Sequence, residues 1–184
     1  MFDELVNLVK KHAGSAINNN PAIPNEKKDE VINETSHSII DSLKNMFSSG
    51  NVQSILKMFT GNHNVSDSSV TNNVSGGLIE RLKNKFGLSH NEASNVANDV
   101  VPNVMDNLVK KTNDPNDSSF DIQSIFNKLS GGSTSGFNVQ GLLNKFKGMN
   151  FDQDGDGDTD LQDLTKVVSG SGSGILDKVK GMFN

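Results

Sequence analysis

The clearest evidence for the fold class is the segment LSHNEASNVANDVVPNVMDNLV, residues 88–109. Ser89 and Glu92 form a capping box, in which each side chain satisfies a free backbone N–H at the start of a helix. Beyond the box, apolar residues recur every four positions, at Val96, Val100, Val104 and Leu108. Because this spacing places them on one face of a helix, the stretch predicts an amphipathic helix over about 90–111.

This predicted helix has a counterpart 65 residues earlier in the chain. The two segments align without a gap, and the matched pairs are Val31 and Val96, Asn33 and Asn98, Glu34 and Asp99, Ile39 and Val104, Ile40 and Met105, Asp41 and Asp106, and Leu43 and Leu108. Pro102 stands where the earlier copy has His37, and it predicts a kink because proline removes a helical hydrogen bond. The sequence therefore predicts two related helical modules.

Apolar residues at helical spacing mark the remaining long helices. The stripes are Phe2, Leu5, Val6 and Val9, then Ile32, Ile39, Leu43 and Met46 within about 26–47, and then Leu78, Ile79, Leu82 and Phe86. The alternation that is typical of a strand is missing, and the β-branched residues are scattered. We therefore predict an all-α fold, a helical bundle.

Four short segments share a second pattern, in which Asn or Asp precedes an apolar residue and Gln. They begin at Asn51, Asp121, Asn138 and Asp160, and they end shortly before Gly61, Gly131, Gly148 and Gly170. Asn or Asp is suited to cap a helix N-terminus, and Gly is suited to the turn that ends a helix. Each segment predicts a short helix that is stable only when it docks on another element.

Composition excludes several classes of site and partner. The chain has no Cys, so it forms no disulfide and no thiolate metal site. Its net charge is −5, and no cluster of Lys and Arg with aromatic residues suggests nucleic-acid binding. No apolar run reaches the length of a signal peptide or of a membrane span, so a cytoplasmic protein is expected.

An acidic cluster lies near the C-terminus, in FDQDGDGDTDLQDL, residues 151–164. Aligned with the twelve-residue EF-hand loop, positions 1, 3, 5, 7, 9 and 12 are occupied by Asp152, Asp154, Asp156, Asp158, Asp160 and Asp163. Gly157 stands at position 6, where the loop turns sharply. A bound Ca²⁺ would neutralise carboxylates that otherwise repel one another. The pattern predicts a Ca²⁺ site, and a solvated acidic turn is the alternative.

The loop departs from a calcium-sensor loop in three ways. Asp163 replaces the usual Glu at position 12, as in dockerin-type loops, and Thr159 stands where paired loops usually have Ile or Val. Gly148 interrupts the incoming helix, and the sequence has no second loop of this spacing. These departures favour a single, weak or structural site over a sensor that opens a groove.

Together the patterns divide the chain into five regions. These are a first helical module at 1–62, a polar linker at 63–75, a second module at 76–132, an EF-hand-like helix-loop-helix at 138–169, and a Gly/Ser linker with a flexible amphipathic tail helix at 170–184. The apolar stripe of the tail helix comprises Ile175, Leu176, Val179, Met182 and Phe183. That helix could dock on its own bundle, on a partner or on a membrane surface.

The first 150 residues resemble the YidB-like bacterial family, a domain of unknown function. The resemblance rests on VPNVMDNLV at 101–109, KTNDPND at 111–117 and FDIQSI at 120–125. FDELV at 2–6 and NPAIP at 20–24 resemble members that end in an aspartate loop. The family implies a small, soluble, helical bacterial protein and supplies no catalytic residue.

The sequence offers little that is typical of an enzyme. The four histidines, His12, His37, His63 and His90, are scattered without metal-ligand spacing, and no Ser lies in a Gly-x-Ser-x-Gly elbow. Glu34 and Asp99 match in the repeat and could form a carboxylate pair, although solvated helix faces explain them more simply.

We therefore expect a non-enzymatic, calcium-binding helical protein that acts as an interaction or scaffolding module, with an unidentified protein partner or a second copy. The alternative is a membrane-surface or self-assembling protein that acts through the tail helix, and a hydrolase is the least favoured interpretation.

Overall fold

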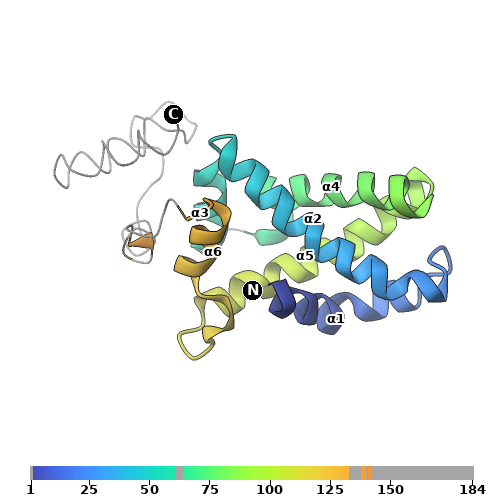
Figure 1. Cartoon of the computed structure of the whole chain (residues 1–184), viewed down its shortest axis with the longest axis horizontal. Coiled ribbons are helices and arrows are strands. Elements are labelled where there is room, and N and C mark those ends of the chain that lie inside the picture. The colour runs from blue at the N-terminus through green and yellow to red at the C-terminus, as the bar shows by residue number, and fades with distance from the viewer. Residues whose placement is uncertain (1, 61–63, 133–137, 140, 142–184) are drawn as a thin grey trace.

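A computed structural model of the chain describes residues 2–60, 64–132, 138–139 and 141 (Figure 1). These residues are all-helical, as predicted, and none of them lies in a strand. The α-helices are α1 (Phe2–Asn18), α2 (Lys28–Ser48), α3 (Val52–Phe59), α4 (Ser69–Phe86), α5 (His90–Asn113) and α6 (Ile122–Leu129). Short 3₁₀ turns lie at Asn25–Lys27 (η1), Val65–Asp67 (η2) and Ser118–Phe120 (η3).

The four long helices form a bundle in which α2 and α5 each pack against both α1 and α4. The short helices α3 and α6 lie near one another at one end of the bundle (Figure 1). Phe126 of α6 makes edge-to-face contacts with Phe47 of α2 and Phe59 of α3, with ring centroids 6.0 and 6.4 Å apart. The aromatic cluster therefore ties α6 to helices that precede it by more than 60 residues.

The core is built from the apolar stripes of the long helices. On α1 the buried residues Leu5, Val9, Ala13 and Ile17 recur every four positions, and on α4 the same spacing gives Val70, Val74, Leu78 and Leu82. Two buried hydroxyls of α2, those of Thr35 and Ser36, donate to carbonyls one turn earlier, at Val31 and Ile32. These bonds let polar side chains enter the core without losing a hydrogen bond.

Within the described residues, some of the predicted helix caps are confirmed. The capping box of α5 is confirmed, since Ser89 Oγ accepts from the N–H of Glu92 and the Glu92 carboxylate accepts from the N–H of Ser89. Asp121 caps α6 by accepting from the N–H of Ser124 at 2.8 Å. Gly131, predicted to end this helix, has a φ of 63°, in the left-handed region.

The predicted cap at Asn51 is wrong, because its side chain makes no capping hydrogen bond to α3. Asn51 has φ −78° and ψ 31°, whereas Asp121 has φ −66° and ψ 127°. A capping residue needs the extended conformation that Asp121 adopts. The tight connection between α2 and α3, which spans only residues 49–51, holds Asn51 in a conformation that is neither helical nor extended.

Two helices are longer than the sequence stripes predicted. The stripe ending at Val9 belongs to a helix that continues to Asn18. Helix α4 begins at Ser69, inside the segment 63–75 that was expected to be a polar linker, and Ser68 caps it by accepting from the N–H of Thr71. Helix α5 runs through Pro102, and the kink expected there stays a prediction.

Helices α2 and α4 approach each other closely where small side chains meet. A Cβ atom added at Gly77 would lie 2.7 Å from Ser42 Oγ and 3.4 Å from Ser38 Oγ. Ser38 is buried, and its Oγ has no hydrogen-bond partner among the described residues. A side chain at Gly77 would therefore require the Ser42 hydroxyl or the helix to move.

Candidate functional site

The predicted calcium ligands lie outside the residues that the structure describes. They are Asp152, Asp154, Asp156, Asp158, Asp160 and Asp163. Within residues 2–60, 64–132, 138–139 and 141, no group of three or more His, Asp or Glu side chains is placed to hold a metal ion.

The segment that leads toward this loop begins on α6. Gln123 Oε1 accepts a hydrogen bond of 2.9 Å from the backbone N–H of Val139. The Val139 side chain is buried in the hydrophobic core, with 2% of its surface exposed. Asn138 Oδ1 accepts from the N–H of Gly141 at 2.6 Å, as a helix cap does. The described residues at the predicted start of the third short helix therefore contact α6 and the core.

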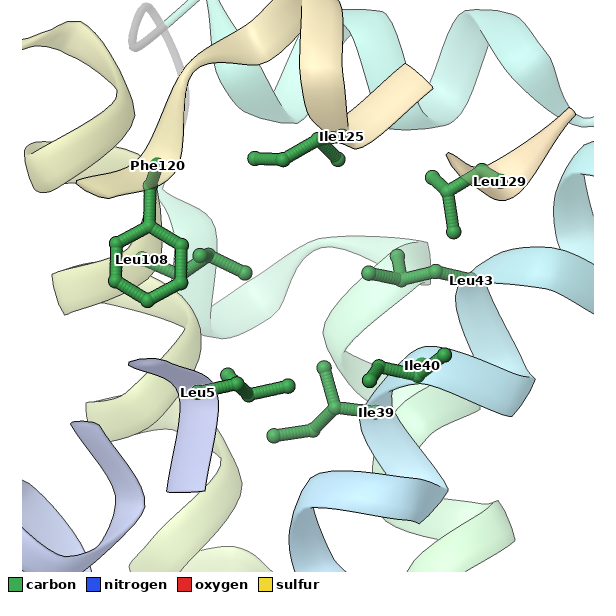
Figure 2. Close-up of a pocket in the computed structure, with 8 residues that line it drawn as sticks. All are labelled: Leu5, Ile39, Ile40, Leu43, Leu108, Phe120, Ile125 and Leu129. Carbon is green, nitrogen blue, oxygen red and sulfur yellow. The ribbon is translucent and has the colours of Figure 1, made fainter. Parts of the chain in front are cut away.

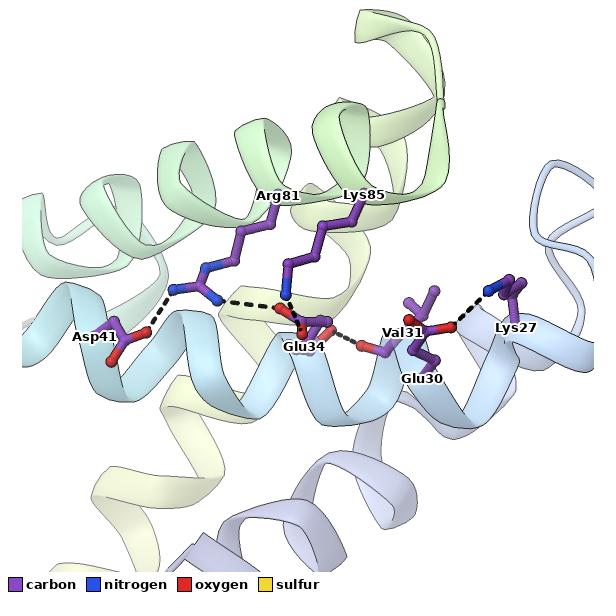
Figure 3. A network of polar contacts seen from close by, with 8 residues as sticks. Lys27, Glu30, Val31, Glu34, Asp41, Arg81 and Lys85 are labelled. Carbon is purple, nitrogen blue, oxygen red and sulfur yellow. Dashed lines mark hydrogen bonds and ion pairs between the residues drawn. The ribbon is translucent and has the colours of Figure 1, made fainter.

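The most extensive described polar contact joins α2 to α4 (Figure 3). Arg81, the only arginine of the chain, donates to Glu34 Oε2 at 3.1 Å and to Asp41 Oδ2 at 2.5 Å. Lys85 donates to the other oxygen of Glu34 at 2.5 Å. The Glu34 side chain is only 13% exposed, so this carboxylate is partly desolvated between two cations.

The electrostatics of Glu34 favour its charged form. Burial raises the pKa of this carboxyl, but hydrogen bonds from Lys85 and Arg81 outweigh burial, and the net pKa is lowered. An ionised carboxylate held by two cations is a poor proton acceptor. The carboxylate pair considered for Glu34 and Asp99 therefore has little support, since Glu34 is bound by α4 and Asp99 is exposed on α5.

The described histidines do not assemble into a site. His90 is the first residue of α5, as predicted, and both His90 and His37 are exposed. His12 on α1 is half-buried, and its pKa is lowered first by burial and then by the charges of Lys11 and Lys111. His63 lies outside the described residues.

A second polar cluster closes the loop between α5 and η3. Asp117 forms an ion pair with Lys111 and accepts hydrogen bonds from the hydroxyl and the N–H of Ser119. The Lys111 and Ser119 contacts lower the pKa of Asp117 well below its usual range. These bonds join the last turn of α5 to the start of η3, so the cluster stabilises the connection into α6.

An apolar cavity of about 20 Å³ lies where α1, α2, α5, η3 and α6 meet (Figure 2). It is lined by Leu5, Ile39, Ile40, Leu43, Leu108, Phe120, Ile125 and Leu129. A volume of about 10–15 Å³ holds one water molecule, but a water needs polar partners that this lining does not offer. The cavity is therefore a packing defect of the core and too small for a substrate.

Sequence reasoning missed both the Arg81 contacts and the role of Gln123. Arg81 is the only arginine in the sequence, and its planar guanidinium suits contacts with two carboxylates. Its presence among many lysines was therefore a signal of such a contact. Gln recurs at the third position of each short segment, at Gln53, Gln123, Gln140 and Gln162. That recurrence pointed to a shared role for the side chain, but not to its hydrogen-bond partner.

Comparison with known proteins gives one match. A family model described as "Bacterial protein of unknown function (DUF937)" matches residues 68–183, more than half of the chain. The match agrees with the expected resemblance to a bacterial domain of unknown function, although that resemblance was drawn over the first 150 residues. Neither a curated protein nor a solved structure matches the chain. Among the described helices, none is both long and apolar enough to cross a membrane.

Proposed function

The chain belongs to the bacterial family of unknown function DUF937, and we propose that it is a non-enzymatic helical interaction protein whose C-terminal loop binds one Ca²⁺ ion. The observation that carries this proposal is the spacing of the six aspartates over 152–163 around Gly157. Ca²⁺ takes six to eight oxygen ligands, and this spacing supplies side-chain or backbone oxygens at each EF-hand ligand position.

The chemistry of the loop supports a cation more than an empty acidic turn. Six carboxylates within twelve residues repel one another, and a divalent ion would remove much of that repulsion. The single loop and the short Asp163 at its end favour weak binding, because ligand charge and site rigidity set the affinity. We therefore expect a stabilising site that orders its own segment when filled.

We also propose that the bundle is an internal repeat, with α1–α3 and α4–α6 as its two copies. Burial supports this proposal, because the buried stripe of α1 matches that of α4 at an offset of 65 residues. Buried pairs at the same offset on α2 and α5 are Val31 and Val96, Ile32 and Ala97, Thr35 and Val100, Ser36 and Val101, Ile39 and Val104, and Leu43 and Leu108. The family match begins at Ser68, the cap of α4, which agrees with a unit that starts there.

An interaction role fits the way the described polar groups are used. Glu34, Asp41 and Asp117 are each bound by cationic side chains that join elements of the fold. The chain continues past the bundle beside α6, where Gln123 accepts a hydrogen bond from the N–H of Val139. We expect a partner protein or a second copy to contact the segments that follow α6.

Calorimetric titration of CaCl₂ into the metal-free 184-residue chain tests the calcium proposal. We expect about one ion per chain, and we expect binding to be lost in the double variant Asp152→Ala, Asp156→Ala. The matched control, Glu26→Ala with Asp99→Ala, removes two exposed carboxylates from the bundle and should bind as the wild type does. If the wild type and the control bind no Ca²⁺, the loop is an acidic turn.

The second candidate function is self-assembly or membrane-surface binding by the tail helix. The apolar stripe of Ile175, Leu176, Val179, Met182 and Phe183 after a Gly/Ser linker favours it. Deleting residues 174–184 should then reduce oligomer size or vesicle association. This idea is wrong if both are unchanged by the deletion.

A further inference from the structure

Helix α6 has two half-buried polar side chains, Gln123 and Asn127, beside its apolar stripe. Gln123 and Asn127 lie four residues apart, so they share one face of the helix. Gln123 Oε1 receives the N–H of Val139, and Asn127 Oδ1 is buried but accepts no hydrogen bond from any described residue. A buried acceptor without a donor is costly, so this face is built to receive polar groups from another segment.

The chain beyond α6 turns back toward this face. Gly131 and Gly132 have φ values of 63° and 98°, and the N–H of Gly132 donates to the carbonyl of Asn127 at 2.8 Å. Only glycine adopts such angles readily, and two in succession reverse the chain at the end of the helix. At Val139 the chain lies beside the first turn of α6 again, because the N–H of Val139 donates to Gln123.

The sequence after the reversal fits a helix that continues along α6. Val139, Leu142, Leu143 and Phe146 have the spacing of one helical stripe. The first of these side chains already belongs to the hydrophobic core, and Asn138 supplies a cap to Gly141. A short helix of this kind has little stability of its own in water, so it needs a surface on which to dock.

We propose that the face of α6 formed by Gln123 and Asn127 is the docking surface for residues 138–146 of the same chain. Gln123 anchors the first turn of this segment through the N–H of Val139. Asn127 lies one turn further along and offers its Oδ1 to a donor of the segment. Docking would thereby fix the helix that enters the aspartate loop, a consequence that rests on the proposed calcium function.

Hydrogen–deuterium exchange of the 184-residue chain tests the docking. Gln123→Met keeps the length of the side chain but removes the acceptor, and we expect the amides of 139–146 to exchange about fivefold faster. Gln123→Glu keeps an acceptor, and Ser124→Ala changes an exposed neighbour on α6, so both should behave as the wild type does. The amides of α2 and α5 should be unchanged in all three variants.

A second variant keeps the test decisive if Gln123→Met destabilises α6. Val139→Ser removes the buried side chain from the docked segment itself and should also accelerate exchange over 139–146. The proposal is overturned if neither variant changes this exchange, or if the wild-type amides of 139–146 exchange at the rate of an unprotected peptide.

The link to calcium is measured separately, by titrating CaCl₂ into the wild type and Gln123→Met. We expect the variant to bind Ca²⁺ about fivefold more weakly, because the docked state is then less populated. Equal Kd values overturn the link to the loop. If the wild type itself binds no Ca²⁺, the proposed function fails, whereas the exchange data still decide whether 138–146 docks on α6.

Discussion

Gly77 of α4 faces Ser42 of α2 so closely that a Cβ atom on the glycine would lie 2.7 Å from the serine Oγ. Its neighbour Gly76 is exposed, and a Cβ atom there would meet nothing within 4 Å. Both glycines lie inside the same helix and lower its intrinsic stability alike. The pair therefore separates the effect of close packing from the effect of helix propensity.

We predict that Gly76→Ala raises the free energy of unfolding by about 0.5–1 kcal/mol, because alanine is the better helix former. Gly77→Ala should lower it by about 1–2 kcal/mol, because the new methyl group forces Ser42 or the helix to move. Urea denaturation followed by circular dichroism measures both. Adding Ser42→Ala to Gly77→Ala should restore part of the loss. Equal gains for the two glycine variants would contradict the close contact.

The bridge from Arg81 to Glu34 and Asp41 should contribute measurable stability. We expect Arg81→Met to lower the free energy of unfolding by about 1–2 kcal/mol, since it leaves two carboxylates with fewer partners. Arg81→Lys should recover less than half, because lysine lacks the planar fork that reaches both acceptors. Lys27→Met is the control: it breaks the exposed pair with Glu30 and should cost under about 0.5 kcal/mol. Similar losses for Arg81→Met and Lys27→Met would argue against a special role for the bridge.

The same bridge predicts a dependence on pH. The lowered pKa of Glu34 means that its ionised form stabilises the fold fully above the ordinary glutamate pKa of about 4.3. This contribution is lost as the pH falls through the lower pKa of the folded state. The wild type should therefore exceed Glu34→Gln in stability near neutral pH, and the difference should shrink steadily below about pH 4.3. A difference that stays constant on acidification would show that the charge of Glu34 contributes nothing.

Equivalent caps in the two short helices should respond differently to alanine. Asp121→Ala should cost about 1 kcal/mol, because it removes the hydrogen bond to the N–H of Ser124. Asn51→Ala should change stability by less than about 0.5 kcal/mol, because Asn51 makes no capping bond. Thermal and urea unfolding of the two variants compare them directly. An equal cost at both positions would mean that Asn51 caps α3 in solution.

Much of the fold could be predicted because strong local signals agree with the final packing. The capping box at Ser89 and the stripe from Val96 to Leu108 fix the start and the buried face of α5. The start of α4 was missed because Ser, Thr and Asn are weak helix formers, and its first turns are stabilised by burying Val70 and Val74 against other helices.

The contacts between helices were beyond what local patterns can predict. Arg81 lies 47 residues from Glu34 and 40 from Asp41, so no spacing rule connects them. At Asn51 a local pattern predicted a helix cap that does not form. Asparagine is a suitable capping residue, but its neighbours hold it in a conformation that does not allow capping. The aspartate loop was recognised from its spacing alone, and it stays a prediction because its residues lie outside the described chain.

The aromatic contacts of Phe126 have a consequence for the order in which the chain is made. Its ring closes against Phe47 and Phe59, which leave the ribosome 67 residues or more before it does. Synthesis proceeds at about 5–20 residues per second, so several seconds pass before Phe126 can cover the rings of Phe47 and Phe59. Nascent chains of this protein should therefore present a transient apolar surface to chaperones until α6 has been synthesised.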